Sequence, residues 1–93
     1  MRPVQLPIDG TLDLHAFEPR DVRAVVQDYL EAAWGRGLRE VRLIHGRGRG
    51  VQRRLVQATL DQSPLVIEFW DAPESHLGAT VVRLAPSDAP SDR

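Results

Sequence analysis

A helical stripe of apolar residues lies between two strand-like segments, and few folds accommodate that order. One helix face would carry six apolar side chains, at Val22, Val25, Val26, Tyr29, Leu30 and Ala33. Residues 11–15 alternate apolar with polar side chains, and residues 41–45 are rich in β-branched and aliphatic ones. Pro19 suits the first turn of the intervening helix, and Gly35 and Gly37 suit its end. This unit favours two parallel strands joined by a right-handed crossover.

The C-terminal half continues the alternation. A second helix is predicted to begin near Val51 and to stop before Pro64. Strands are predicted at residues 65–70 and 79–84, joined by a polar turn. The order β-α-β-α-β-β predicts an α/β two-layer sandwich, in which two helices cover one face of a four-stranded mixed sheet. A chain of 93 residues has room for one such domain.

The two ends of the chain differ from its middle. Residues 1–9 show no sustained periodicity and are expected to form a flexible arm, while residues 86–93, rich in Pro, Ser and Asp, are expected to be disordered. The folded domain is therefore predicted at residues 10–85. With no cysteine, a disulfide scaffold, a thiolate zinc site and a cysteine nucleophile are excluded. No apolar run approaches the ~18 residues of a membrane span, so we expect a cytoplasmic protein without a membrane partner, as a monomer or within a larger assembly.

Positive charge is concentrated in one window. All twelve cationic side chains are arginine, and seven of them lie between Arg36 and Arg54 against the single Glu40, which gives that window a net charge of +6. The whole chain has a net charge of −1, so the cluster favours a defined anionic site over general adhesion to nucleic acid. The alternative is an ordinary solvated surface, with arginines paired to acidic residues of the first helix: Asp21, Asp28 and Glu31.

The candidate chemical residues come at the ends of the first two strands. Asp13 and His15 are two apart, so on a strand both would leave the same face, and His45 ends the second strand. A loop of alternating glycine and arginine follows directly: Gly46, Arg47, Gly48, Arg49 and Gly50. It leads into a helix N-terminus, where free N–H groups attract anions, with Arg53 and Arg54 close by. Together these residues predict a phosphate cradle flanked by a carboxylate and two imidazoles.

Each feature also has a purely structural interpretation. Asp13 could cap backbone N–H groups, and His45 could fix the glycine loop through a side-chain hydrogen bond instead of taking part in catalysis. The three glycines resemble part of a dinucleotide-binding fingerprint, with Glu68 near the end of the next strand, but the spacing is not G-x-G-x-x-G. Trp34 and Trp70 suit a core or its rim better than a base-stacking surface.

The motifs together resemble the Smr (small MutS-related) domain, of the standalone bacterial type. The family opens with L-D-L-H-G, present here as Leu12-Asp13-Leu14-His15 followed by Ala16, and continues with H-G-x-G, intact at residues 45–48. Arg53 matches the arginine of the family's L-R pair, and Leu77-Gly78 stands where a Gly-Trp is often found. The resemblance implies a fold similar to the C-terminal domain of bacterial translation initiation factor three. It also implies nucleic-acid binding, with cleavage of RNA or nicking of DNA by Asp13 and His15, in some members at ribosomes.

These residues suggest acid–base cleavage of RNA, whose 2′-OH supplies the nucleophile. His15 would be the general base or acid, oriented by Asp13, with His45 or a water on the opposite side of the phosphate. Arg53 and the amides of residues 46–50 would stabilise phosphoryl charge. No cofactor is expected for RNA, whereas DNA would require a divalent metal to activate water. Two alternatives remain: a non-catalytic module that binds nucleic acid or the ribosome through the arginine loop, and a small nucleotide-phosphate binder.

Overall fold

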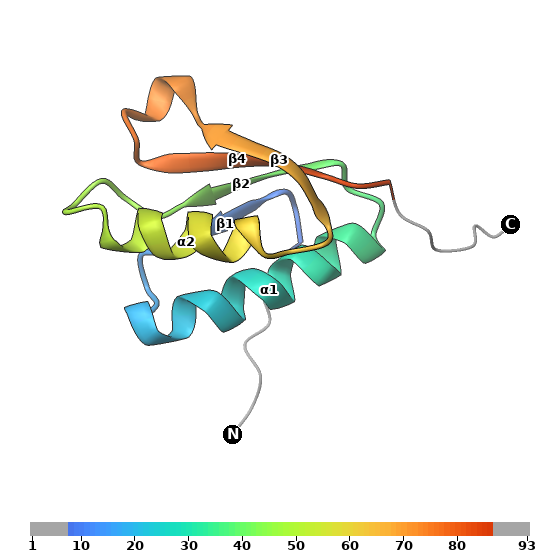
Figure 1. Ribbon diagram of the computed structural model, residues 1–93, viewed down its shortest axis with the longest axis horizontal. Coiled ribbons are helices and arrows are strands. Elements are labelled where there is room, and N and C mark those ends of the chain that lie inside the picture. Colours follow the sequence, from blue (N-terminus) through green and yellow to red (C-terminus); the bar gives the residue numbers. More distant parts are fainter. Residues whose placement is uncertain (1–7, 87–93) are drawn as a thin grey trace, which may run out of the picture.

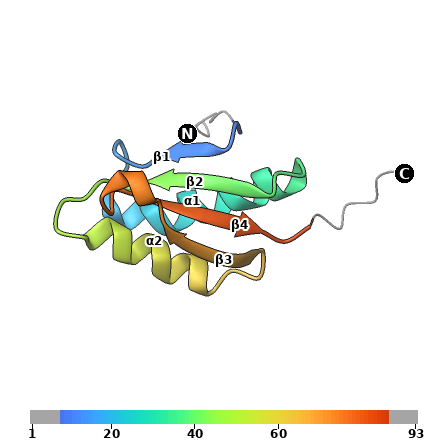
Figure 2. The ribbon, with the colours of Figure 1, turned by 90° about the horizontal axis from the view of Figure 1, so that it is seen from above.

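The computed structural model describes residues 8–86, which form two layers. The elements, in chain order, are β1 (Thr11–Asp13), α1 (Pro19–Gly35), β2 (Glu40–Ile44), α2 (Val51–Asp61), β3 (Val66–Asp71), a 3₁₀ turn (Pro73–Ser75) and β4 (Ala79–Leu84). The strands form one sheet in the order β1-β2-β4-β3, with β1 parallel to β2 and β4 antiparallel to both of its neighbours. Both helices lie against the same face of this sheet (Figures 1 and 2). The predicted α/β sandwich with a mixed sheet is confirmed.

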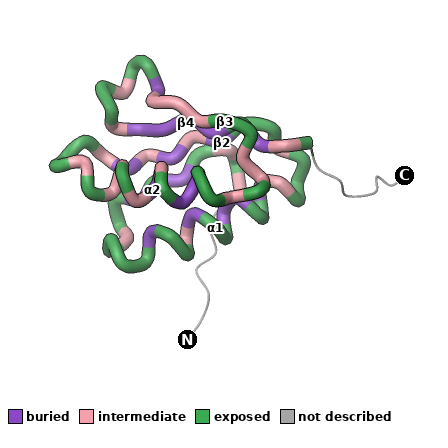
Figure 3. The backbone as a smooth tube through the Cα atoms, in the orientation of Figure 1, coloured by how far each residue is buried: buried purple, intermediate pink, exposed green. Residues whose placement is uncertain are grey.

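The apolar stripe of α1 determines which face of that helix is buried. Its buried residues are Val22, Val26, Tyr29, Leu30 and Ala33. Pro19 occupies the first turn, as expected of a residue with no N–H to leave unpaired. The stripe packs on α2 and on the inner face of the sheet, so the core lies between the two layers (Figure 3).

The strand ends differ from the prediction at three places. β1 ends at Asp13 and β2 at Ile44, so neither His15 nor His45 is a strand residue; each begins the loop that follows. α2 ends at Asp61 and β3 extends to Asp71, one residue beyond the predicted end. The shorter strands follow from their pairing, because β1 has only three partners on β2, from Arg42 to Ile44.

The predicted arm and tail fall largely outside the described residues. Of the arm, Ile8 packs against the core and the Asp9 carboxylate accepts a hydrogen bond from the Thr11 N–H. Of the tail, only Pro86 is described, and its carbonyl accepts the indole N–H of Trp34. Among residues 8–86 no helix is both long enough and apolar enough to cross a bilayer.

Candidate functional site

The sheet brings three strand ends to one edge. Because β4 is antiparallel to both β2 and β3, the C-terminal ends of β1, β2 and β3 meet there, beside the start of β4. α/β sheets commonly bind ligands at such an edge. Of the predicted residues, Asp13 ends β1, and His15, His45 and the arginine loop (residues 46–50) follow the strand ends. The residues predicted to form the site therefore lie together at this edge of the sheet.

Asp13 and His15 form a hydrogen-bonded pair. One oxygen of Asp13, Oδ1, accepts both the backbone N–H of His15 at 2.9 Å and its ring Nδ1–H at 2.7 Å. A turn achieves this contact, not the strand alternation that the sequence suggested, since His15 lies beyond β1. The backbone hydrogen bond, followed by the ring hydrogen bond, lowers the pKa of Asp13. An ionised Asp13 can only accept, so it fixes the proton on Nδ1 and leaves His15 Nε2 free.

Nε2 of His15 lies directly over the first glycine of the arginine loop. A Cβ added to Gly46 would stand 3.0 Å from this nitrogen, and Gly46 has φ +80°, a conformation that favours glycine. His15 is exposed, with 64% of its side chain accessible. The exposed ring therefore holds, above the loop, a nitrogen that has no hydrogen-bond partner among the described residues.

The ring of His45 has no free nitrogen. The residue is only 4% exposed, its Nδ1–H donates to the Gly46 carbonyl at 2.9 Å, and its Nε2 accepts the Thr80 hydroxyl at 2.9 Å. Burial is the main cause that lowers the pKa of His45 and favours the neutral ring. Of the two roles that the sequence left open for His45, this geometry matches the one in which it fixes the loop.

A chain of hydrogen bonds continues from His45 to α2 and β3. The carboxamide of Gln57 donates to Thr80 Oγ1 and to Asp71 Oδ1, both at 3.2 Å. Arg53 donates from Nε and Nη2 to the two oxygens of Asp71, both at 2.8 Å. Those bonds lower the pKa of Asp71 and raise that of Arg53. Arg53, predicted to face a phosphate, thus has two of its nitrogens engaged by a carboxylate.

The rest of the arginine loop is open. Arg47 and Arg49 are exposed, and within residues 8–86 neither has a carboxylate partner. The described ion pairs join arginines to Glu74, Asp71 and Glu68, and not to the helix residues Asp21, Asp28 and Glu31 that a solvated surface would have used. The loop ends at Gly50, from which α2 begins. Cationic side chains and the N-terminus of an 11-residue helix therefore face the same space.

Three hollows meet at Arg47. The first, the site hollow of about 340 Å³, is lined by His15, His45 and residues 46–52. The second, the arginine hollow of about 390 Å³, lies between residues 47–50, Arg53, Arg54 and the turn at His76 and Leu77. The third, the sheet-face hollow of about 410 Å³, extends from His15 and Arg47 over Arg42, Ile44, Glu74, Ser75, Gly78 and Ala79.

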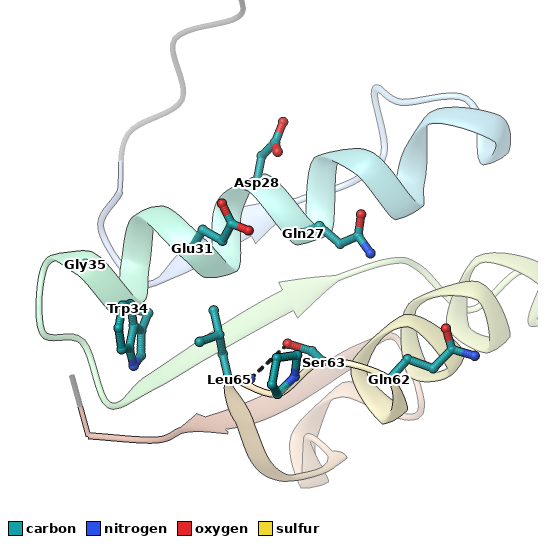
Figure 4. Close-up of a pocket in the computed structure, with 9 residues that line it drawn as sticks. Gln27, Asp28, Glu31, Trp34, Gly35, Gln62, Ser63 and Leu65 are labelled. Carbon is teal, nitrogen blue, oxygen red and sulfur yellow. Dashed lines mark hydrogen bonds between the residues drawn. The ribbon is translucent and has the colours of Figure 1, made fainter. Parts of the chain in front are cut away.

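A larger hollow of about 640 Å³ lies elsewhere. It occupies the space between the C-terminal half of α1 and residues 62–65, and Trp34, Glu31 and Leu65 line it (Figure 4). None of the predicted site residues contributes to it. Within residues 8–86, no three carboxylate or imidazole side chains are grouped as a metal site would require.

The sequence did not predict that Asp71, Gln57 and Thr80 belong to the site. Asp71 could have been predicted, because it ends an apolar strand just as Asp13 does. The acidic residue considered on this strand was Glu68. Thr80 occupies the position on β4 opposite both Leu43 and Asp71, a pairing that requires the sheet order. Gln57 carries no local signal, since its position on α2 matters only once that helix packs beside β4.

Comparison with known proteins agrees with this geometry. Residues 12–85 match the Smr domain. The chain belongs to the Smr domain family. It is 37% identical over 79 residues to Endonuclease MutS2 of Caldicellulosiruptor saccharolyticus, covering 83% of this chain and 10% of that protein. It is 36% identical over 77 residues to Endonuclease MutS2 of Thermus thermophilus, covering 81% of this chain and 10% of that protein. The chain thus spans about a tenth of the length of these relatives.

Two solved Smr structures share the fold. The Smr domain of Thermus thermophilus MutS2 superposes with a TM-score of 0.78 at 35% identity, over 82% of this chain and 98% of that one. YdaL, a stand-alone small MutS-related protein from Escherichia coli, superposes with a TM-score of 0.76 at 29% identity, over 84% of this chain and 66% of that one. The similarity to an Smr domain therefore spans nearly all of the described fold.

Proposed function

We propose that this Smr domain is an endonuclease that cleaves RNA by acid–base chemistry at His15. The observation that carries the proposal is the Asp13–His15 pair, in which a 2.7 Å hydrogen bond holds Nδ1 and leaves Nε2 open above the arginine loop. This is the arrangement of an oriented general base. Relatives named as endonucleases share the domain and support the same class of activity.

The reaction follows from which groups are free. His15 Nε2 takes the proton of a 2′-OH, the 2′-oxygen attacks the adjacent phosphorus, and the bond to the 5′-oxygen breaks. A water protonates the departing 5′-oxygen, because both ring nitrogens of His45 are engaged in the interior, and the hydroxide that remains takes the proton from His15. Arg47, Arg49 and the first N–H groups of α2 stabilise the charge on the phosphoryl oxygens. The products are a 2′,3′-cyclic phosphate and a 5′-hydroxyl end.

RNA is the better substrate because it carries its own nucleophile. A DNA strand lacks the 2′-OH, so its hydrolysis would need an activated water, usually a water bound to a metal. Asp13 and His15 could offer a divalent ion two ligands at this edge, and their mutual hydrogen bond would have to be given up. Nicking of DNA is therefore the less favoured reaction of this site.

The test compares an RNA with the same RNA carrying one 2′-deoxy nucleotide at the cut. Wild-type protein should cleave only the first, in the presence of EDTA, and leave a 2′,3′-cyclic phosphate. Asp13→Asn should reduce cleavage at least about tenfold, because a neutral amide holds the His15 proton less firmly. Asp9→Asn is the matched control, since the Asp9 carboxylate makes the same two-residue contact, to the Thr11 N–H at 3.1 Å, away from His15. Cleavage that survives Asp13→Asn, His15→Ala or removal of the 2′-OH would refute the mechanism.

The second candidate is binding without cleavage. It is favoured by the exposed arginines, which have no carboxylate partner in the described part of the chain, and by the burial of the second imidazole. On this hypothesis the loop holds the phosphates of a structured RNA, such as a ribosomal surface. Salt-sensitive RNA binding that is unaffected by His15→Ala, together with no cleavage, would favour this function over the first.

A further inference from the structure

The face of the sheet opposite the helices has a hollow that opens directly from the proposed active site. The sheet-face hollow shares His15, Gly46 and Arg47 with the site hollow. Its remaining walls are apolar at Ile44 and Ala79 and charged at Arg42 and Glu74. At about 410 Å³ it lies within the size range of small-ligand sites. An apolar floor with a few convergent polar groups is typical of a site that reads one ring system.

The charged wall is an ion pair that stays accessible. Arg42 Nη2 contacts Glu74 Oε2 at 2.6 Å, with 38% and 62% of the two side chains exposed. A hydrogen bond from its own backbone N–H and the contact with Arg42 lower the pKa of Glu74, so it is an acceptor at neutral pH. Arg42 keeps further N–H donors beyond the one used in the pair. The pair therefore presents donors beside acceptors along one wall.

We propose that this hollow binds the guanine base of a nucleotide next to the cleaved phosphate. The Watson–Crick edge of guanine presents one acceptor, O6, followed by two donors, N1–H and N2–H. Arg42 can donate to O6 while the Glu74 carboxylate accepts from N1–H and N2–H, as charged side chains do when they read bases. The inference rests on the proposed function, because the cleaved phosphate at His15 places the neighbouring base.

The other three bases fit this wall less well. Adenine and uracil can satisfy only two of the three contacts, and uracil then turns a second carbonyl oxygen toward the carboxylate. Cytosine also satisfies only two contacts, with N3 on Arg42 and N4–H on Glu74. The loss of the third hydrogen bond, or a carbonyl oxygen that faces the carboxylate, is the basis of the expected discrimination.

A second ion pair on the same face provides the control. Arg83 contacts Glu68 at 3.3 Å, with about half of each side chain exposed. The Arg83 guanidinium lies 5.7 Å from the centre of the Trp70 ring, and neither residue of this pair lines the site hollow or the sheet-face hollow. Glu68→Gln therefore changes the same chemistry on the same sheet without reaching the proposed base site.

The first experiment maps the cuts made by the full chain in an RNA of random sequence. Wild type should cut next to guanine with a preference of about tenfold over the other bases, the effect of one bidentate base contact. Glu74→Gln should remove most of that preference, because an amide cannot accept two hydrogen bonds side by side. Glu68→Gln should keep the wild-type preference. No base preference in the wild type, or equal effects of the two variants, would overturn the proposal.

The second experiment is independent of cleavage. Guanosine, adenosine, cytidine and uridine monophosphates are titrated into 15N-labelled protein, and the amide shifts of Ile44 and Ala79 are followed. Guanosine monophosphate should bind at least about fivefold more tightly than the other three, and Glu74→Gln should abolish the difference. Equal binding of all four, or none, overturns the base site. A guanine preference here in a protein that cuts no RNA would instead refute the proposed function and keep the base site.

Discussion

Replacement of Gly46 by alanine tests whether the arginine loop controls the position of His15. Gly46 has φ +80°, and the added Cβ would stand 3.0 Å from His15 Nε2, closer than ordinary van der Waals contact. Gly37 also has φ +80°, and nothing lies within 4 Å of the Cβ that it would gain. The two substitutions therefore impose the same backbone strain, and only one of them displaces the imidazole.

The expected magnitudes separate stability from activity. A side chain in the left-handed region costs about 1–2 kcal/mol, so both variants should lose that much unfolding free energy, or roughly 4–16 °C of Tm. The exposed ring of His15 can move away by a few tenths of an ångström at little further cost. A displacement of about 1 Å can cost a hundredfold in rate, so Gly46→Ala should lower kcat roughly three- to tenfold and leave KM unchanged.

The assay measures initial rates of RNA cleavage beside urea unfolding for wild type, Gly46→Ala and Gly37→Ala. The NMR resonances of the His15 ring, followed in the same three proteins, show the displacement independently of activity. Control of the His15 position by the loop is refuted if both variants retain the wild-type rate, or if Gly37→Ala lowers the rate as much as Gly46→Ala does. It is also refuted if the ring resonances of His15 are the same in Gly46→Ala and in wild type.

Three further predictions concern the buried hydrogen bonds and the arginine loop. Thr80→Val leaves the His45 Nε2 without its donor and should lower the unfolding free energy, measured in urea, by about 2 kcal/mol. Thr59→Val loses only a hydrogen bond to a helix carbonyl and should lower it by less than about 1 kcal/mol. Equal losses in the two variants would contradict this. Burial lowers the pKa of His45 below 6.5, so the unfolded chain takes up the proton first as the pH falls. The unfolding free energy should therefore be fully present above pH 6.5. At lower pH it should decrease by up to about 1.4 kcal/mol per pH unit. That slope should be absent in His45→Gln, and a flat wild-type profile between pH 5 and 6.5 would count against a buried neutral ring. Arg47→Gln should reduce the salt slope of RNA binding by about one, while Arg39→Gln, at the residue before β2, should leave it unchanged. Equal slopes would exclude Arg47 from phosphate contact.

Local periodicity was sufficient to predict the elements and their class, since each helix buries one apolar face and the strands are rich in apolar residues. The strand order needed more than periodicity, because β4 pairs between β2 and β3 although it comes last in the chain. One signal does point to the centre of the sheet. Residues 79–82 of β4 are all buried, as a strand covered on both faces requires, whereas β3 exposes Ile67 and Glu68 at a bulge and lies at the edge. The buried run at residues 79–82 thus distinguishes β4 from the edge strand β3, whereas β2, which is also interior, alternates buried with more exposed side chains.

The alternation of buried and exposed side chains, which continues past the last residues of β1 and β2, separates the two histidines of the motifs. Leu12 and Leu14 are buried while Asp13 and His15 are exposed, so the pair falls on the open side.

After β2 the histidine lies on the buried side instead. His45 falls in step with the buried Val41 and Leu43, which places its ring in the interior beside Thr80. Arg42 and Ile44 fall on the opposite face and line the sheet-face hollow. His45 of the Ile-His-Gly motif therefore fixes the arginine loop from the interior, through its hydrogen bond to the Gly46 carbonyl. Arg42 and Ile44, on the other face of the same strand, line the proposed base site. Because this division follows from the two-residue period of a strand, it applies to any chain of this fold whose second strand keeps the alternation.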